Sequence, residues 1–241
     1  MKPIELYEDI RKYCSANADE AIVRKYSRYF KEGYDAYGLT KERIEDKVDS
    51  ILSDKSVNMR LVLSASRHLV KSEKYEETSF AILLLKQFSK QFTAGTFKEI
   101  EKWFEIGITN WGHTDGICGI IISEFFERNI ISLDALSDWR TAKNKYQRRA
   151  VPVAMIATLK VTADFEPLFG FIEPLMLDEE RFVQQGLGWF LREAWKIRKN
   201  QTEAFLLKSK NEAPRLIYQY ATEKMTAKEK KRFKKDKSKK S

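Results

Sequence analysis

The chain has 241 residues and a formal net charge of +9, from 44 lysines and arginines against 35 aspartates and glutamates. Hydrophobic residues make up 43% of it and aromatic residues 12%, which is enough apolar surface for a core and excludes a mainly disordered protein. Ten basic and three acidic side chains lie in residues 221–241, so this segment carries +7 of the +9. A uniformly basic protein is therefore excluded.

The cysteines and the chain's hydropathy indicate the compartment. Cys14 and Cys118 lie far apart, and the sequence has no Cys-x-x-Cys and no histidine at metal-ligand spacing. We therefore expect a reducing cytoplasm, or the nucleoid in a prokaryote, and no metal, nucleotide or redox cofactor. The N-terminus resembles no secretory signal, and the longest weakly charged stretch, residues 151–161, is shorter than the roughly 20 apolar residues that span a bilayer.

Apolar residues recur with helical rather than strand spacing along most of the chain. The five prolines and ten glycines fall mostly between these periodic segments, which favours helices throughout. In chain order, the predicted helices cover residues 2–16, 18–31, 40–54, 57–69, 78–88, 96–108, 113–127, 131–141, 144–160, 163–177, 180–198, 200–209 and 211–223.

These helices come in pairs at intervals of roughly 35–45 residues, which is typical of a HEAT-like helical-repeat solenoid. In such a fold each pair buries its apolar face against its neighbours. The alternative is an irregular globular helical domain, but the short linkers favour stacking. We predict an all-α fold with one domain over residues 1–225.

The segment from Thr226 onward has a different composition. Lysine and serine dominate residues 226–241, and Phe233 is the only aromatic residue there. We predict a flexible basic tail, which is either a solvated end or an electrostatic arm for phosphate backbones.

The common catalytic motifs are absent from the sequence. No Gly-x-x-x-x-Gly-Lys-Ser/Thr, Gly-x-Ser-x-Gly or His-Glu-x-x-His occurs, and the pair Gly186 and Gly188 lacks a phosphate-loop context. His68 falls in an apolar stripe, so we expect it in the core, far in sequence from His113. Nucleophilic triads and metal-dependent hydrolysis are therefore not predicted.

A set of aromatic and charged residues after residue 103 remains. A helix that begins near Trp111 places Trp111 and Asp115 on one face, four residues apart. A second predicted helix carries the adjacent residues Arg148 and Arg149, and a third carries Trp189 three residues before Arg192. We expect these groups to converge on one concave face: Arg148, Arg149, Trp189 and Arg192.

Each of these residues also has a purely structural interpretation. A tryptophan at helical spacing is often a core residue, and Arg149 is also consistent with a surface ion pair. Asp115 near a helix start gains roughly 0.3–1 kcal/mol from the helix dipole.

In order and spacing, these residues resemble the AlkD family of DNA alkylation-repair glycosylases. The resemblance covers most of residues 20–200 and includes Tyr29, Trp111-x-x-x-Asp115, Arg149 before an alanine, and Phe-Val-Gln-Gln-Gly-Leu-Gly-Trp-Phe-Leu-Arg-Glu at residues 182–193. It implies a HEAT-like solenoid whose concave face holds duplex DNA, acting as a monomer.

The resemblance also implies roles for single residues. Asp115 matches the catalytic carboxylate, and Arg149 matches an arginine that contacts the DNA backbone beside the lesion. Trp111, Trp189 and Tyr29 match residues that line the site and pack on the sugar-phosphate. The family excises positively charged N3- and N7-alkylated purines without inserting the base in a pocket, unlike most glycosylases.

This chemistry agrees with the residues present. An alkylated purine that already carries a positive charge leaves as a neutral base and needs no protein acid. Bond cleavage leaves an oxocarbenium-like sugar, which one carboxylate can stabilise while it orients the attacking water. Indole faces attract such a cation with roughly 0.5–2 kcal/mol each.

The sequence departs from the family pattern at two places. Where the family pattern is Trp-Trp-Asp-x-Val-Asp, this chain has Asn110 at the first position and Gly112 at the third. Its turn at residues 38–43 is also shorter than the family's and lacks the proline. We expect the first change to alter how the helix start meets DNA and the second to weaken minor-groove contacts. The alternatives to a glycosylase are a non-catalytic nucleic-acid binder and a protein-interaction scaffold.

Overall fold

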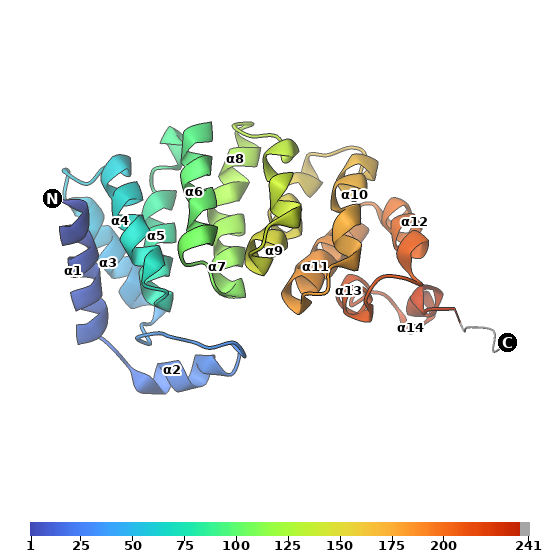
Figure 1. The fold of residues 1–241 in the computed structure, drawn as a ribbon, viewed down its shortest axis with the longest axis horizontal. Helices are drawn as coiled ribbons and strands as arrows, with labels where there is room; N and C mark the ends of the chain where they lie inside the picture. The colour runs from blue at the N-terminus through green and yellow to red at the C-terminus, as the bar shows by residue number, and fades with distance from the viewer. Residues whose placement is uncertain (237–241) are drawn as a thin grey trace. The chain divides into compact units, whose positions relative to one another are not determined.

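The computed structural model describes residues 1–236, and every regular element among them is helical (Figure 1). The chain divides into two compact units, Met1–Ile130 and Ile131–Ser241. The single domain over residues 1–225 stays a prediction, and each unit is described by itself below.

The first unit contains ten helical elements within the described chain. They are α1 (Pro3–Ala16), α2 (Glu20–Ser27), α3 (Lys41–Ser53), α4 (Met59–Lys71), α5 (Tyr75–Lys86), the 3-10 helix η1 (Ser89–Gln91), α6 (Ala94–Ile106), α7 (Trp111–Gly116), the π-helical η2 (Ile117–Ile122) and α8 (Ser123–Glu127).

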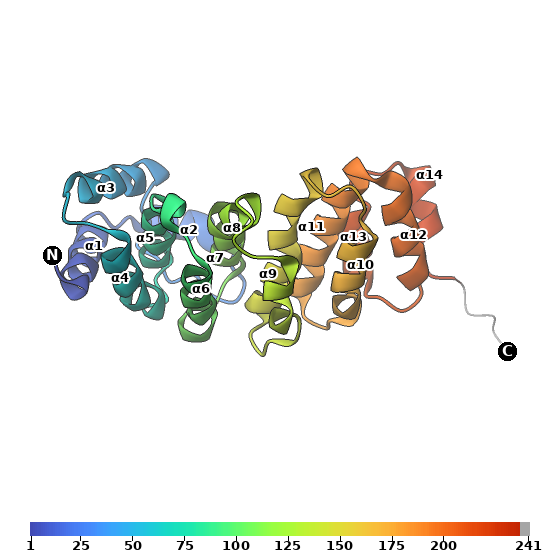
Figure 2. The same cartoon turned by 90° about the horizontal axis from the view of Figure 1, so that it is seen from above.

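Helix α5 is the centre of the first unit. It buries its carboxylates Glu76 and Glu77 as well as its apolar residues, because it packs against α1, α3, α4 and α7. Helix α4 in turn packs against α1, α5 and α6, as the second view shows (Figure 2). By contrast, α2 has no buried residue and lies apart from these helices, joined by an extended segment (Figure 1).

The second unit contains the remaining elements. They are the 3-10 helices η3 (Leu133–Leu136) and η4 (Asp138–Thr141), α9 (Lys145–Met155), η5 (Ile156–Lys160), α10 (Glu166–Ile172), η6 (Glu173–Leu177), α11 (Arg181–Ile197), α12 (Lys199–Ser209), α13 (Arg215–Ala221), α14 (Ala227–Lys230) and η7 (Lys231–Phe233).

Helix α11 is the centre of the second unit because glycines let two helices approach it. A Cβ on Gly186 would lie 3.1 Å from Arg149 Cγ on α9. A Cβ on Gly188 would lie 2.5 Å from Tyr220 Cβ and 2.7 Å from the Ile217 carbonyl oxygen, both on α13. The Gly-x-Gly spacing that has no phosphate-loop context therefore serves close helix packing.

Most predicted helices are present, with shifts of a few residues at their ends. The predicted helix at residues 131–141 is instead two short 3-10 helices. The prediction of a core position for His68 is wrong, because its side chain is exposed and lies 5.7 Å from the Tyr7 ring, centroid to centroid.

The predicted flexible tail is folded as far as Asp236. Thr226 caps α14, and the side chain of Phe233 is fully buried. Arg232 forms an ion pair with Glu203 on α12, and Glu229 accepts a hydrogen bond from Lys199 Nζ at 2.5 Å. The prediction failed there because the partners lie about thirty residues earlier. Residues 237–241 of the predicted tail lie outside the described residues.

We predict that Gly188→Ala lowers the free energy of unfolding by about 1–3 kcal/mol, because the new methyl group has no space between α11 and α13. The matched control is Gly170→Ala in α10, where a Cβ would meet nothing within 4 Å. There we expect no loss and a gain of up to about 1 kcal/mol from helix propensity. Urea denaturation of both variants measures the difference, and equal stabilities would contradict the packing account.

Candidate functional site

Helix α7 begins at Trp111 because Asn110 caps it. Asn110 Oδ1 accepts a hydrogen bond from the His113 backbone N–H at 2.9 Å, and the Asn110 carbonyl accepts one from Thr114 Oγ1 at 2.9 Å. Asparagine is among the preferred capping residues because its side-chain oxygen satisfies a free N–H of the first turn. The predicted helix start is confirmed, and Trp111 and Asp115 stand one turn apart.

His113 is buried beneath this helix start, with 3% of its surface exposed. Its Nδ1 lies 2.8 Å from Asn110 Nδ2 and its Nε2 lies 2.9 Å from the Tyr75 carbonyl oxygen. An amide nitrogen donates and a carbonyl oxygen accepts, so the proton is on Nε2 and the ring is neutral. Burial lowers the pKa of His113 to about 4, which keeps it neutral at pH 7.

Trp111 is fixed by contacts with the segment after α2. Its ring stacks on Phe30 with centroids 5.2 Å apart and an angle of 14° between the planes. Its indole N–H donates to the Tyr29 carbonyl oxygen at 3.3 Å. Phe30 stacks in turn on Tyr34, at 4.6 Å. The half-buried indole is therefore held in one orientation rather than free to rotate.

Asp115 is half-buried on the same helix. The pKa of the Tyr75 hydroxyl is raised, first by burial and then by the negative charges of Glu76 and Asp115. Asp115 therefore lies close enough to Tyr75 for its charge to oppose ionisation of the phenol. The Tyr75 ring also stacks on the buried imidazole of His113, with centroids 4.6 Å apart.

The segment that carries Tyr29 and Phe30 is tied to α5 by a buried carboxylate. We call residues 19–40, which include α2, the α2 arm. Glu76 accepts hydrogen bonds from the backbone N–H groups of Tyr37 at 2.8 Å, Gly38 at 2.7 Å and Leu39 at 3.1 Å. Gly38 has φ +85°, and a Cβ there would lie 2.1 Å from the Asp19 carbonyl oxygen, so this turn requires glycine.

Tyr29 is the most exposed of the predicted site residues in the first unit, at 54%. Arg28 Nη2 donates to its hydroxyl at 3.1 Å, and the guanidinium carbon lies 4.9 Å from its ring centroid. A cation and an aromatic ring are thus presented together at the end of α2.

In the second unit, Arg149 lies on α9 and is only 6% exposed. Its Nη1 donates to the Phe182 carbonyl oxygen at 2.7 Å, in the first turn of α11. The arginine is therefore held between two helices, which the adjacent Gly186 permits.

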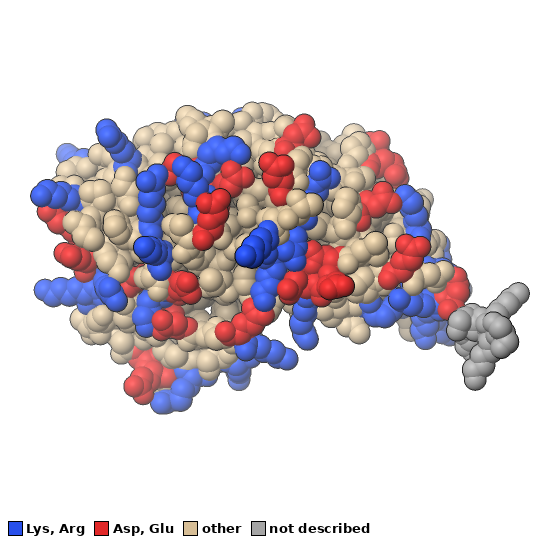
Figure 3. Space-filling view, viewed as in Figure 1, with Lys and Arg blue, Asp and Glu red and all other residues tan. Residues whose placement is uncertain are grey.

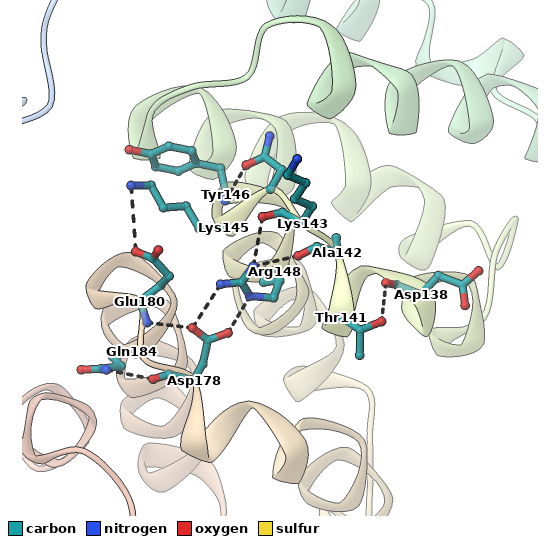
Figure 4. A network of polar contacts seen from close by, with 11 residues as sticks. Asp138, Thr141, Ala142, Lys143, Lys145, Tyr146, Arg148, Asp178, Glu180 and Gln184 are labelled. Atoms are coloured by element: carbon teal, nitrogen blue, oxygen red, sulfur yellow. Dashed lines mark hydrogen bonds and ion pairs between the residues drawn. The ribbon is translucent and has the colours of Figure 1, made fainter.

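Arg148, which the sequence predicts as a DNA contact, has hydrogen-bond partners within its own unit. Its Nε donates to Asp178 Oδ2 at 2.6 Å, and its Nη1 donates to the Ala142 carbonyl oxygen at 2.7 Å (Figure 4). Figure 4 shows the guanidinium pointing at Asp178. The sequence could not reveal this because the carboxylate lies thirty residues further along the chain.

Arg192 and Trp189 lie on α11. Arg192 forms ion pairs with Glu193, at 3.0 Å, and with Glu223. Its charge, like that of Arg148, is balanced by carboxylates of the same unit. Trp189 is half-buried between the buried residues Gly188 and Phe190.

Charge on the visible surface follows the same pattern. On the face shown in Figure 3, lysines and arginines are interspersed with aspartates and glutamates and form no single-sign patch. Among residues 1–236, no group of three or more His, Cys, Asp or Glu side chains is placed to hold a metal ion. In the same part of the chain, every helix is too short or too polar to cross a membrane.

The predicted residues thus fall into two sets. Tyr29, Trp111 and Asp115 belong to the first unit, where Tyr29 and Trp111 are in direct contact. The arginines and Trp189 belong to the second unit. Sequence reasoning missed Phe30, Tyr34, Tyr75, Glu76 and His113. The density of aromatic residues at 26–37 was the signal for some of them, whereas Glu76 is an ordinary acidic residue in the sequence.

Both units are built of helices, and in the first unit the half-buried Asp115 stands one turn after the fixed indole of Trp111. These features define a helical-repeat protein with a candidate site at a helix start. The family described as DNA alkylation repair enzyme matches residues 10–225, so the chain belongs to this family and its role lies in the repair of alkylated DNA.

Among the solved structures of similar fold is one described as a predicted DNA alkylation repair enzyme from Enterococcus faecalis. The TM-score is 0.76 at 15% sequence identity, over 88% of this chain and 98% of that chain. No curated protein matches the chain.

We predict that the neutral His113 makes the fold sensitive to acid. The unfolded chain binds a proton near pH 6.5 and the folded chain only near pH 4, so stability is intact above pH 6.5 and falls by about 3 kcal/mol as the pH drops to 4. His113→Gln removes the titrating group, so its unfolding free energy should depend less on pH over this window. Urea denaturation at a series of pH values measures both slopes, and equal slopes would contradict the assignment.

Proposed function

We propose that the protein is a DNA glycosylase that excises positively charged N3- and N7-alkylated purines from duplex DNA, with Asp115 as its catalytic carboxylate. The observation that carries the proposal is the α7 start. Asn110 and His113 fix the helix, Phe30 and Tyr29 fix Trp111, and Asp115 follows one turn later.

The reaction needs a single carboxylate. The bond between the sugar C1′ and the purine nitrogen breaks, and its electron pair moves to the base, which leaves neutral because it was a cation. The positive charge then resides on the sugar, where Asp115 stabilises it electrostatically. A water molecule adds to C1′ and gives its proton to the carboxylate, which completes hydrolysis.

The contribution of Trp111 is to present an electron-rich ring beside the developing cation. Such a contact contributes roughly 0.5–2 kcal/mol, depending on how much water is removed. Its value depends on the ring's being held in place, which the stacking on Phe30 at 5.2 Å supports. Enzymes gain most from groups that need no reorganisation during the reaction.

Contacts with the DNA backbone involve both units in this proposal. Tyr29 and Arg28 offer an exposed hydroxyl, ring and guanidinium at the end of α2. In the second unit the proposal retains Trp189 and Arg149, which is 6% exposed. Arg148 and Arg192 are left out because each is already paired with carboxylates. We further propose HEAT-like helix pairing, a monomeric state and a cytoplasmic or nucleoid location.

We predict that Asp115→Asn lowers the rate of 7-methylguanine release from alkylated duplex by about 100-fold or more, with normal folding, because the neutral amide no longer stabilises the cation. Glu105→Gln is the matched control, an exposed carboxylate on α6 of the same unit, and it should leave the rate unchanged. Single-turnover base release measures both. An active Asp115→Asn variant would exclude this mechanism, and a wild type that binds DNA without releasing base would instead indicate a non-catalytic nucleic-acid binder.

We predict that Trp189→Ala lowers the single-turnover excision rate at least tenfold while changing affinity for undamaged duplex less than threefold, because the indole packs on the lesion's sugar-phosphate. Trp195→Ala is the control on the same helix. Trp195 donates its indole N–H to Glu203 at 3.0 Å, so its loss should reduce stability but not excision by the folded protein. Equal losses of excision in the two variants would remove Trp189 from the site.

A further inference from the structure

The C-terminal segment, which we define as residues 226–236, follows directly after the part of the chain that matches the family, residues 10–225. It contains six basic and two acidic residues and forms α14 and η7. Thr226 begins α14 with a capping box, in which Glu229 Oε2 accepts a hydrogen bond from the Thr226 backbone N–H at 2.8 Å. The segment therefore has a regular helical start.

Both acidic side chains of the C-terminal segment pair with lysines of the preceding part of the second unit. Glu229 accepts a hydrogen bond from Lys199 Nζ at 2.5 Å, and Asp236 accepts one from Lys210 Nζ at 2.6 Å. Phe233, which lies between them in sequence, is fully buried. The negative charges of the segment thus serve its attachment and do not neutralise its own lysines.

The lysines of the C-terminal segment are arranged differently. Residues three apart lie on the same side of a 3-10 helix and nearly so on an α-helix, so Lys228, Lys231 and Lys234 follow one side of α14 and η7. Four exposed lysines, which we call the lysine row, have ammonium groups without an ion-pair or hydrogen-bond partner among residues 1–236: Lys228, Lys231, Lys234 and Lys235. Their charges are available to an external anion.

The lysine row suits the phosphate backbone of duplex DNA. Lysine ammonium groups bind phosphates as point charges, and each phosphate that they neutralise releases condensed counterions. The family's role in the repair of alkylated DNA brings such phosphates to the protein. A membrane surface suits the segment less well, because membrane-surface helices insert exposed apolar side chains. Phe233 is the only large apolar residue of the segment, and it is buried.

We propose that the lysine row binds the phosphate backbone of duplex DNA irrespective of base sequence or lesion, and so adds affinity for undamaged DNA. Because the segment is attached to the second unit before binding, the lysines lose less conformational freedom than those of an unattached tail. This goes beyond the proposed function, since it requires neither base excision nor Asp115. It rests on the chain's role in DNA repair alone.

The test is fluorescence anisotropy of a labelled, undamaged duplex of about 20 base pairs, titrated with protein at a series of NaCl concentrations. In the lysine-row variant all four lysines are replaced by glutamine. We expect its affinity at about 100 mM NaCl to fall tenfold or more. The slope of log affinity against log salt concentration should become shallower by about 2–3.6, because each lost phosphate contact removes about 0.9.

The matched control makes the same change in net charge elsewhere on the protein. Four other exposed lysines without an ion-pair partner in the described chain are replaced by glutamine: Lys12, Lys55, Lys90 and Lys160. A general effect of net charge would weaken both variants equally, whereas we expect the control to lose less than about threefold. The proposal is overturned if the lysine-row variant binds duplex as wild type does, or loses no more affinity than the control.

Two further ligands distinguish duplex DNA from other polyanions. Vesicles of phosphatidylserine and phosphatidylcholine represent a membrane surface, and a single-stranded RNA of the same length represents RNA. We expect the lysine-row substitutions to weaken binding of duplex DNA more than binding of either. A larger effect on vesicles or on RNA than on duplex DNA would overturn the proposal.

The outcome is separable from that of the proposed function. The lysine-row substitutions should weaken duplex binding by the same factor in an Asp115→Asn background, because binding of undamaged DNA does not use the catalytic step. At saturating protein, the lysine-row variant should release base from alkylated duplex within about twofold of the wild-type rate. A protein whose duplex affinity depends on the row but that releases no base would refute the glycosylase and retain this proposal. Base release with no effect of the row on affinity would do the reverse.

Discussion

The candidate site depends on one buried interaction, the Glu76 carboxylate that accepts three backbone hydrogen bonds from residues 37–39. A carboxylate in this position is stable only because each donor offsets part of the cost of removing its charge from water. Through it, the otherwise unburied α2 arm has a fixed end on the central helix of the first unit. Tyr29 and Phe30, in the same arm, take their positions from that attachment.

The α7 start adds a second constraint on the same region. Asn110 and the neutral His113 hold the first turn from one side, and Phe30 holds Trp111 from the other. The two departures from the AlkD-like pattern thus have structural consequences here. Asn110 supplies the cap, and Gly112 lets Tyr75 and Phe30 approach the helix backbone closely. The change from the family's residues therefore alters the shape of the site without removing Asp115.

Charge in this protein is largely balanced at short range. Arg148, Arg192 and Arg232 each pair with a carboxylate from another element of the second unit, and the folded part of the basic C-terminal segment contributes to packing through Phe233. A net charge of +9 is therefore a poor guide to which cations meet DNA. Tyr29 and Arg28, exposed at the end of α2, are better candidates than the paired arginines.

The sequence by itself determined the all-helical fold, most helix positions and the spacing of Trp111 and Asp115, because helical periodicity and capping are local properties. Only the tertiary structure decided which arginines are already paired, that His113 rather than His68 is buried, and that Phe233 joins a core. Each of these depends on partners thirty or more residues away, or on the packing of several elements at once. No local sequence pattern encodes such contacts, since an arginine or glutamate occupies the same place in the sequence whether its side chain is solvated or buried against a partner.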